Sequence, residues 1–309
     1  MIIVRTPLRI SIAGGGTDLP VWSREHGSMF ISAAINKYIY ITLQRSAYNP
    51  KINLRYSEIE EVDIVDEIKH DIIRETLKHV GEKGPVQITS HADIPSGAGL
   101  GSSGAFGVAV LHALKEDIKD RINLAIMASR IQMGQLGYPI GYQDQLAAAL
   151  GGVNEYRIDE KDECTVMPLQ FNHSKFLEKI VLFHTGIKHD ANDVLKKSST
   201  DGLQEVQNLA WEMKYALNTG DFDAYGEMLD AHWKQKKRRG AMSSQLIDEW
   251  YDLGIKNGAL GGKLIGAGGG GFLLFYTTDR DRLINNMPLQ HEPFQFDFEG
   301  SKIIYEDIR

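Results

Sequence analysis

The sequence predicts a protein of two domains that combine strands and helices, and three observations support this prediction. The 309 residues exceed the length at which one hydrophobic core usually stops growing. Segments with the composition of strands occur mainly before residue 185, whereas long charged helices are expected over residues 201–217, 221–237 and 243–256. A content of 42% hydrophobic and 24% charged residues is typical of globular proteins.

The composition excludes several classes of function. A formal net charge of -7 argues against broad binding to nucleic acid, so we expect no such partner. Cys164 is the only cysteine, which excludes an intrachain disulfide and a cysteine-based zinc site and fits a reducing compartment. The N-terminus lacks a long apolar segment, and no run is long enough to span a bilayer. We therefore expect a cytoplasmic protein without membrane association.

The N-terminal segment predicts a strand followed by a polar loop. Residues 2–13 alternate between apolar and polar types, and Arg9 points away from the apolar face. The glycine-rich loop at residues 14–20 contains Asp18, whose carboxylate is able to accept hydrogen bonds from a polyol. The structural alternative is that Asp18 only caps the next turn, and taken alone this alternative is favoured.

The next segments predict core strands and a helix. Residues 28–45 are rich in β-branched and aromatic types and are expected to form one or two strands. Short strands are expected between residues 48 and 66, and a helix over residues 67–80.

A second glycine-rich loop, at residues 95–104, organises the chain. Alternating residues precede it and a run of small apolar residues follows it, so the order is strand, loop, helix. This order directs backbone N–H groups and the positive end of a helix at one place, where an anion is stabilised. Its glycines leave room for the anion, and Ser102 and Ser103 supply hydroxyls for phosphate oxygens or Mg²⁺. For such a loop alone, a tight turn with a serine cap has about equal weight.

Asp144 is the candidate general base. A helix is expected over residues 122–136, and the Ala-Leu run within residues 137–152 is expected to form a short helix closed by glycine. Asp144 lies at the start of the short helix, where the helix dipole stabilises an ionised carboxylate. A plain N-cap explains the same position, and taken alone this explanation is favoured.

The remainder of the chain holds strands, charged helices and a third glycine run. Residues 153–185 predict strands, and their polar turn at residues 159–163 is a plausible connection between domains. The glycine run at residues 260–276 follows a helix and precedes a strand, which is the reverse of the dinucleotide-binding order, so a Rossmann dehydrogenase is rejected. No G-x-x-x-x-G-K-[ST] motif of P-loop nucleotidases occurs.

A basic run lies near the end of the second charged helix and consists of Lys234, Lys236, Lys237, Arg238 and Arg239. Such a run is most often a solvated helix end, although cations also pair with a phosphorylated substrate. The cations available to such a phosphate are Lys188, Lys234, Lys237, Arg238 and Arg239.

Three motifs in a fixed order resemble the GHMP superfamily of small-molecule kinases, which includes galactokinase, homoserine kinase, mevalonate kinase and phosphomevalonate kinase. They are Leu8-Arg-Ile-Ser-Ile-Ala-Gly-Gly-Gly-Thr-Asp-Leu19, Pro95-Ser-Gly-Ala-Gly-Leu-Gly-Ser-Ser103 and Lys263-Leu-Ile-Gly-Ala-Gly-Gly-Gly-Gly-Phe272. The resemblance spans nearly the whole chain. Within the superfamily, residues 13–19, 143–154 and 258–264 are most similar to the D-glycero-D-manno-heptose 7-phosphate kinases.

The resemblance implies an α+β fold of two domains. Residues 1–168 would form an N-terminal domain of the ribosomal protein S5 domain 2 type, which carries the ATP phosphate loop. Residues 169–309 would form a ferredoxin-like C-terminal domain, with the active site in the cleft between the two.

The resemblance also implies an activity and its residues. The protein would transfer phosphate from ATP, with Mg²⁺, to the anomeric hydroxyl of a heptose 7-phosphate. Asp144 would accept the hydroxyl proton, and Arg9 would keep Asp144 ionised and offset charge on the transferred phosphoryl group. Substrate-binding residues would be Gly16, Thr17, Asp18, Gly269 and Gly270. ATP-binding residues would be Pro95, Gly97, Ala98, Gly99, Leu100, Gly101, Ser102, Ser103 and Gly104.

The metal site departs from the family pattern. Sugar kinases of this superfamily use a glutamate on the helix before the catalytic aspartate, and the equivalent position falls on Gln132. Because an amide oxygen is a weaker ligand than a carboxylate for a hard cation, the predicted ligands Ser103 and Gln132 would depend on phosphate oxygens and water.

Two other functions stay open at this point. One is a GHMP kinase for a fucose-like or galactose-like sugar, and the other is a non-catalytic sensor of ATP or sugar. In each case the partner is a small molecule, and the protein is expected to be a monomer or a homodimer.

Overall fold

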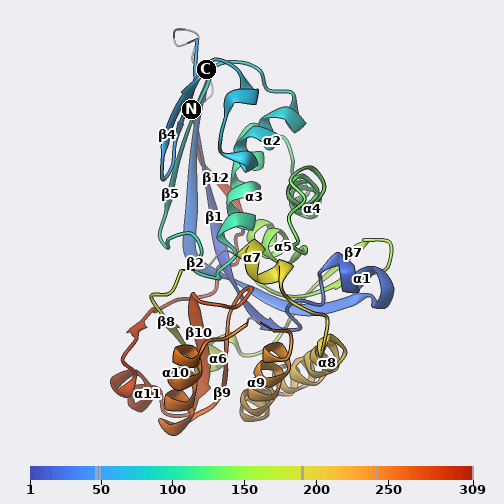
Figure 1. Ribbon diagram of the computed structural model, residues 1–309, viewed down its shortest axis with the longest axis vertical. Coiled ribbons are helices and arrows are strands. Elements are labelled where there is room, and N and C mark those ends of the chain that lie inside the picture. Colours follow the sequence, from blue (N-terminus) through green and yellow to red (C-terminus); the bar gives the residue numbers. More distant parts are fainter. Residues whose placement is uncertain (46–47, 49, 189–190, 241, 308–309) are drawn as a thin grey trace.

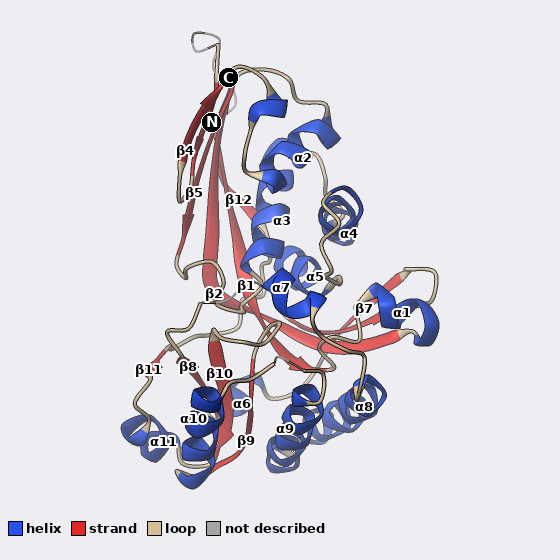
Figure 2. Cartoon of the chain, in the orientation of Figure 1, coloured by secondary structure: helices blue, strands red, loops and turns tan. Residues whose placement is uncertain are grey.

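The computed structural model describes residues 1–45, 48, 50–188, 191–240 and 242–307 (Figure 1). Its described strands form two sheets (Figure 2). The larger sheet has the order β12-β1-β2-β5-β3-β4, and β6 pairs with β2 while β7 pairs with β6. The smaller sheet has the order β11-β8-β10-β9. The larger sheet contains β1 (Ile2–Ala13), β2 (Ser28–Arg45), β3 (Ile52–Arg55), β4 (Ile59–Val62), β5 (Val86–Ala92), β6 (Val153–Ile158), β7 (Cys164–Pro168) and β12 (Lys302–Glu306). The smaller contains β8 (Ile180–His184), β9 (Ala259–Leu264), β10 (Phe272–Thr277) and β11 (Gln290–His291).

Helices cover both sheets (Figure 2). The α-helices are α1 (Pro20–His26), α2 (Asp71–Val80), α3 (Ser102–Leu114), α4 (Arg121–Arg130), α5 (Gln143–Leu150), α6 (His173–Leu177), α7 (Ala191–Lys196), α8 (Leu203–Thr219), α9 (Phe222–Lys237), α10 (Gln245–Lys256) and α11 (Arg280–Asn286). A 3₁₀ turn spans Val65–Glu67 and a π-helical turn spans Ile131–Gln135. The α+β class predicted from the sequence is therefore confirmed. No helix in the described ranges combines the length and apolar character needed for a membrane crossing.

Strand β2 pairs with β1, β5 and β6 and so connects the parts of the larger sheet. It is a single strand of 18 residues, and it confirms the strand composition of residues 28–45. Its N-terminal part pairs with β6 and its C-terminal part with β5, while β1 runs antiparallel along it. The apolar residues Leu8, Ile10 and Ile12 of β1 are fully buried, as their alternation predicts.

Helix α3 lies against β1 and β2 and is almost wholly buried, so its small residues permit close packing on every side. Helices α4 and α5 pack against it in turn. The helix predicted over residues 122–136 is wrong in its last third, because the chain widens there into a π-helical turn. Helix α2 begins four residues later than predicted, because Ile68 is extended.

The C-terminal half confirms the predicted charged helices within two residues at each end, as α8, α9 and α10. The polar turn at residues 159–163 joins β6 to β7 in one hairpin, so it does not connect domains. Strand β12 returns to pair with β1, which places residues 302–306 in the larger sheet. The division of the chain at residue 168 stays a prediction.

Candidate active site

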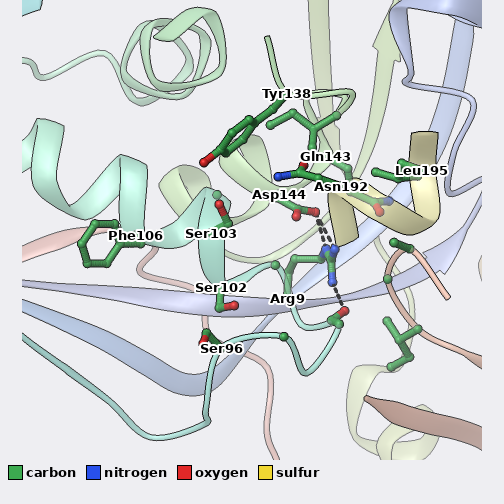
Figure 3. A pocket seen from close by; sticks show the side chains of 18 of the residues that line it. Arg9, Ser96, Ser102, Ser103, Phe106, Tyr138, Gln143, Asp144, Asn192 and Leu195 are labelled. Carbon is green, nitrogen blue, oxygen red and sulfur yellow. Dashed lines mark hydrogen bonds and ion pairs between the residues drawn. The ribbon is translucent and has the colours of Figure 1, made fainter. Parts of the chain in front are cut away.

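A cavity of about 1050 Å³ opens where β1, α3, α5 and the C-terminal part of α9 meet (Figure 3). Its wall is formed by segments far apart in the sequence: the loop after β1, the loop at residues 95–104 and the segment after β9. A volume of this size accommodates a nucleotide and a small substrate together.

The predicted order of strand, loop and helix is confirmed around residues 95–104, since β5 precedes the loop and α3 follows it. Gly97, Gly99 and Gly101 have φ values of 77°, 77° and 75°. These left-handed conformations favour glycine, because a Cβ atom would be strained there. Gly101 is the N-cap of α3, and within the described chain no side chain caps this helix end. The serine-cap alternative is therefore wrong, and the first amides of α3 remain available to an anion.

Most predicted loop residues face the cavity. Those that line it are Gly97, Gly99, Gly101, Ser102, Ser103 and Gly104, together with Ser96, which the prediction omitted. Ala98 and Leu100 are buried in the hydrophobic core instead. Pro95 is exposed and lies outside the cavity wall. The two buried apolar side chains anchor the loop, which leaves its glycines and serines for the ligand.

Arg9 and Asp144 meet inside this cavity (Figure 3). Nε of Arg9 donates to Oδ1 of Asp144 at 2.7 Å, and Nη2 lies 2.5 Å from the same oxygen. Nη1 of Arg9 donates to the carbonyl oxygen of Gly99 at 2.7 Å. The Arg9 side chain is 5% exposed and that of Asp144 is 31% exposed. The guanidinium thus joins β1, the phosphate loop and α5, and it leaves the carboxylate accessible from the cavity.

Asp144 does not cap its helix. Tyr142 occupies the N-cap of α5, and Asp144 is the second helical residue, so the capping alternative is wrong. A close approach of α5 to α3 brings Asp144 to the phosphate loop. A Cβ atom on Gly104 would overlap Cβ of Asp144 and lie 3.2 Å from its backbone carbon. The absence of a side chain at Gly104 therefore allows the carboxylate to lie beside the start of α3.

Asp18 lies in the cavity wall but is buried. Its carboxylate accepts hydrogen bonds from the backbone N–H of Gly16 at 3.3 Å and of Gln143 at 2.9 Å. Burial raises the pKa of Asp18, the hydrogen bond from Gln143 opposes that rise, and the charge of Asp144 adds to it. Leu19 is the N-cap of α1, so the capping alternative for Asp18 is wrong. Asp18 ties the first loop to the start of α5.

The other predicted substrate residues are divided between the cavity and its support. Gly16 lines the cavity. Thr17 is fully buried outside the wall, and its hydroxyl donates to the carbonyl of Gly14 at 2.8 Å. Gly269 donates its N–H to Met242, and Gly270 packs against the carbonyl of Ile187. Gly269 and Gly270 do not line the cavity wall, whereas Gly266 of the same glycine run does.

Gln132 does not fit the metal site predicted for it. Its side chain is fully buried, Nε2 donates to the carbonyl of Ser103 at 2.9 Å, and Oε1 accepts a hydrogen bond from Gln145. The amide oxygen is therefore engaged behind the loop. The hydroxyl-bearing residue Ser103 lines the cavity and fits a metal-binding role. Within the described residues, no group of three or more histidine, cysteine, aspartate or glutamate side chains is arranged to hold a metal ion.

Three of the predicted phosphate-binding cations lie outside the cavity. Lys234 pairs with Asp230 at 2.6 Å, Lys237 pairs with Asp248 at 3.1 Å, and Arg238 donates to Gln235 at 2.9 Å. Lys188 and Arg239 do line the cavity.

The sequence interpretation gave no role to His232 and Lys263 of the cavity wall, and it placed Lys236 in the basic run without naming it among the candidate phosphate-binding cations. A signal for two of them was present, because His232 and Lys236 are four residues apart and therefore share one face of α9. Lys263 gave no such signal, since the glycines of its motif, rather than the lysine, carried our interpretation.

The end of the cavity beyond α3 is apolar and aromatic. His70 stacks on Phe106 with 4.8 Å between ring centroids, and Tyr56 meets His70 edge to face at 4.6 Å. Burial lowers the pKa of His70, so its ring is a neutral aromatic surface near pH 7. The sequence interpretation named no residue of this end, because Tyr56, His70 and Phe106 come from separate segments of the chain.

Comparisons with known proteins agree with this geometry. Residues 67–152 match the GHMP kinases N terminal domain, and residues 213–291 match the GHMP kinases C terminal domain. The chain is 30% identical to a D-glycero-alpha-D-manno-heptose 7-phosphate kinase from Campylobacter jejuni, over 97% of this chain and 98% of that protein. It is 23% identical to a galactokinase from Thermotoga neapolitana, over 87% of each.

A solved structure of a D-glycero-D-manno-heptose 1-phosphate kinase from Bacteroides thetaiotaomicron superposes with a TM-score of 0.80 at 25% identity, and covers 99% of this chain and 100% of that one. The full-length match to a relative at 30% identity and the matches to both family domains lead to one conclusion. The chain belongs to the GHMP kinases and is a phosphotransferase with an alcohol group as acceptor.

Proposed function

We propose that the protein is an ATP-dependent kinase that phosphorylates the anomeric hydroxyl of D-glycero-D-manno-heptose 7-phosphate to give the 1,7-bisphosphate. The observation that carries the proposal is the Arg9–Asp144 pair, because it places a cavity-exposed carboxylate beside the phosphate loop. The Campylobacter jejuni relative, which is a heptose 7-phosphate kinase by name, supports this choice of sugar.

In the proposed reaction, Asp144 accepts the proton of the sugar hydroxyl. The hydroxyl oxygen forms a bond to the γ-phosphorus of ATP while the bond from that phosphorus to the bridging oxygen breaks, and ADP leaves with that oxygen. Arg9 holds the carboxylate in place through two nitrogens and is itself held by the carbonyl of Gly99. Catalysis then comes from positioning and from charge stabilisation, which suits phosphoryl transfer.

The ATP phosphates are proposed to lie on the backbone amides of residues 97–104 and on the N-terminus of α3. The adenine base would fit the aromatic end of the cavity, against Phe106 and His70. Ser103 would contribute its hydroxyl to Mg²⁺, which accompanies ATP and neutralises part of the charge of the phosphates.

The experiment that tests the proposal is ADP release from Mg-ATP with a panel of acceptors. We expect selective turnover of D-glycero-D-manno-heptose 7-phosphate over mannose, galactose, fucose and mevalonate, and ³¹P NMR should place the new phosphate on the anomeric carbon. Turnover of a free sugar alone would keep the kinase chemistry and reject the heptose phosphate. No ADP release with any acceptor would favour a non-catalytic sensor of ATP or sugar.

A further inference from the structure

One corner of the cavity collects four basic side chains from α9, the turn after it and β9. We call His232, Lys236, Arg239 and Lys263 the basic corner. All four line the cavity wall, and all are between 1% and 6% exposed. Burial lowers the pKa of His232, and the positive charges of Lys263, Lys236 and Arg239 lower it further.

The hydrogen-bond acceptors of the three cations are backbone carbonyls. Lys236 donates to the carbonyls of Leu264 at 2.8 Å and Gly266 at 2.6 Å. Lys263 donates to the carbonyl of Ile12 at 3.1 Å. These carbonyls orient the ammonium groups but carry no net charge, so the positive charges remain uncompensated by them.

Arg239 is held in the same way. Its Nε donates to the carbonyl of Ser199 at 3.1 Å, which fixes the plane of the guanidinium. Three buried nitrogens of the basic corner then find no hydrogen-bond partner in the described part of the chain: Nη2 of Arg239 and both ring nitrogens of His232. A buried donor without a partner is unfavourable, and more so when it is charged.

The titration of the lysines points in the same direction. Burial lowers the pKa of Lys263 to about 7, and the charge of Arg9 contributes. Burial, followed by repulsion from Lys263 and Arg239, lowers the pKa of Lys236 well below its ordinary value. Such crowding of cations is unfavourable in the empty protein and becomes favourable when an anion enters.

We propose that the basic corner binds the phosphate group that the sugar substrate already carries, with the Arg239 guanidinium as its bidentate anchor. This inference rests on the proposed function, in which the acceptor is a sugar phosphate. A phosphate dianion has three terminal oxygens, and these match a guanidinium fork together with ammonium and imidazole donors.

The position of Arg239 assigns the anchor to the sugar rather than to ATP. Its Nη1 lies so close to Gly16 that a Cβ atom there would overlap it. Burial lowers the pKa of Arg239, and the charge of Asp18 opposes this decrease. Gly16 and Asp18 both belong to the loop after β1, which is a different segment from residues 95–104. Lys236 lies between the two regions, because Gly266, which accepts its hydrogen bond, packs against Gly99.

The test compares Arg239→Met with Arg238→Met, which removes a neighbouring exposed guanidinium outside the cavity wall. Steady-state kinetics with heptose 7-phosphate and with free D-glycero-D-manno-heptose should show that Arg239→Met lowers the ratio of kcat/KM for the phosphorylated over the free sugar about 100-fold. Most of the loss should be in KM for the sugar phosphate, and KM for ATP should change less than threefold. Arg238→Met should leave the ratio unchanged.

Two outcomes would overturn the proposal. Equal losses with both sugars would mean that Arg239 only supports the structure, and a rise in KM for ATP alone would assign the corner to the ATP phosphates. Arg239→Lys provides a second variant that keeps the charge and the packing. We expect about a tenfold higher KM for the sugar phosphate, because a lysine cannot donate bidentately; an unchanged KM would contradict the anchor role.

Binding of inorganic phosphate separates this inference from the proposed function. Phosphate should raise the Tm of the wild type more than that of Arg239→Met, because a ligand stabilises the folded state that binds it. If the wild type does not phosphorylate heptose 7-phosphate but this difference in Tm is present, the proposed substrate is rejected and phosphate binding by the basic corner is supported. If the wild type phosphorylates heptose 7-phosphate and Arg239→Met has an unchanged KM for it, phosphate binding by the basic corner is rejected and the proposed function is retained.

Discussion

Arg9 and Arg239 occupy the same cavity and are nearly equally buried, yet their surroundings differ. Two nitrogens of Arg9 contact the carboxylate of Asp144, and a third donates to a carbonyl. Arg239 donates to one carbonyl, and its buried Nη2 has no partner in the described residues. A cation that is compensated inside the protein is positioned for the reaction before any ligand arrives. Arg239 forms no direct ion pair among the described residues, because Asp18, the acidic residue whose charge acts on it, accepts hydrogen bonds from backbone N–H groups instead. An entering anion therefore completes the contacts of Arg239.

The largest effect is expected from Asp144→Asn, which removes the charge that compensates Arg9. The amide cannot accept the hydroxyl proton, so kcat should fall about 10³-fold, within the range that general-base catalysis contributes. ATP binding, measured by calorimetry, should survive. Asp281→Asn, an exposed change on α11, is the matched control. Turnover within threefold of the wild type would remove Asp144 from the chemistry.

A smaller effect is expected from Arg9→Lys, which keeps the charge of this pair but not its geometry. An ammonium group on a flexible stem cannot hold Asp144 and the carbonyl of Gly99 with the same planar fork, so kcat should fall by about 10-fold to 100-fold. Arg24→Lys is a matched control, because Arg24 makes a similar two-nitrogen pair with Asp162 at an exposed site. Similar rates for the two variants would show that positive charge alone is sufficient at Arg9.

Gly104→Ala tests the close approach of α3 and α5 that brings Asp144 to the phosphate loop. The new methyl group would overlap Asp144, so α3 and α5 must separate. We expect a loss of about 1–3 kcal/mol in the free energy of unfolding, measured with urea, together with reduced turnover. Gly134→Ala has open space around its Cβ position and should be nearly neutral. Equal stability of the two variants would contradict the close approach of the helices.

The last prediction concerns Lys263 of the basic corner and the dependence of stability on pH. Burial lowers the pKa of Lys263 to about 7, whereas the unfolded chain keeps a value near 10.5. Between these values the unfolded state binds more protons, so Lys263 makes stability rise with pH from about 7 to about 10. The contribution is at most about 1.4 kcal/mol per pH unit. In urea unfolding at pH 7, 8 and 9, Lys263→Met should show a flatter rise than the wild type; parallel curves would place the ordinary lysine pKa in the folded protein.

The local structure around the site follows from the sequence. Alternation in residues 2–13 predicted β1 and the outward direction of Arg9, and the small-residue run after residue 104 predicted α3. The charged periodicity after residue 200 predicted α8, α9 and α10. Hydrophobic periodicity and glycine conformations depend on residues that are close together in the chain, so the sequence is sufficient to predict these features.

Tertiary structure alone decided which side chains meet. Arg9 and Asp144 are 135 residues apart, and Lys263 reaches a carbonyl 251 residues away. It also turned Thr17 and Gln132 into buried supports, although their motif positions suggested ligand contacts. It brought Lys236 into the cavity while Lys234 and Lys237, on the same helix, face away to Asp230 and Asp248. Whether a basic residue meets solvent, a carboxylate or a ligand depends on which face of its element is packed, and that is settled only when distant segments come together.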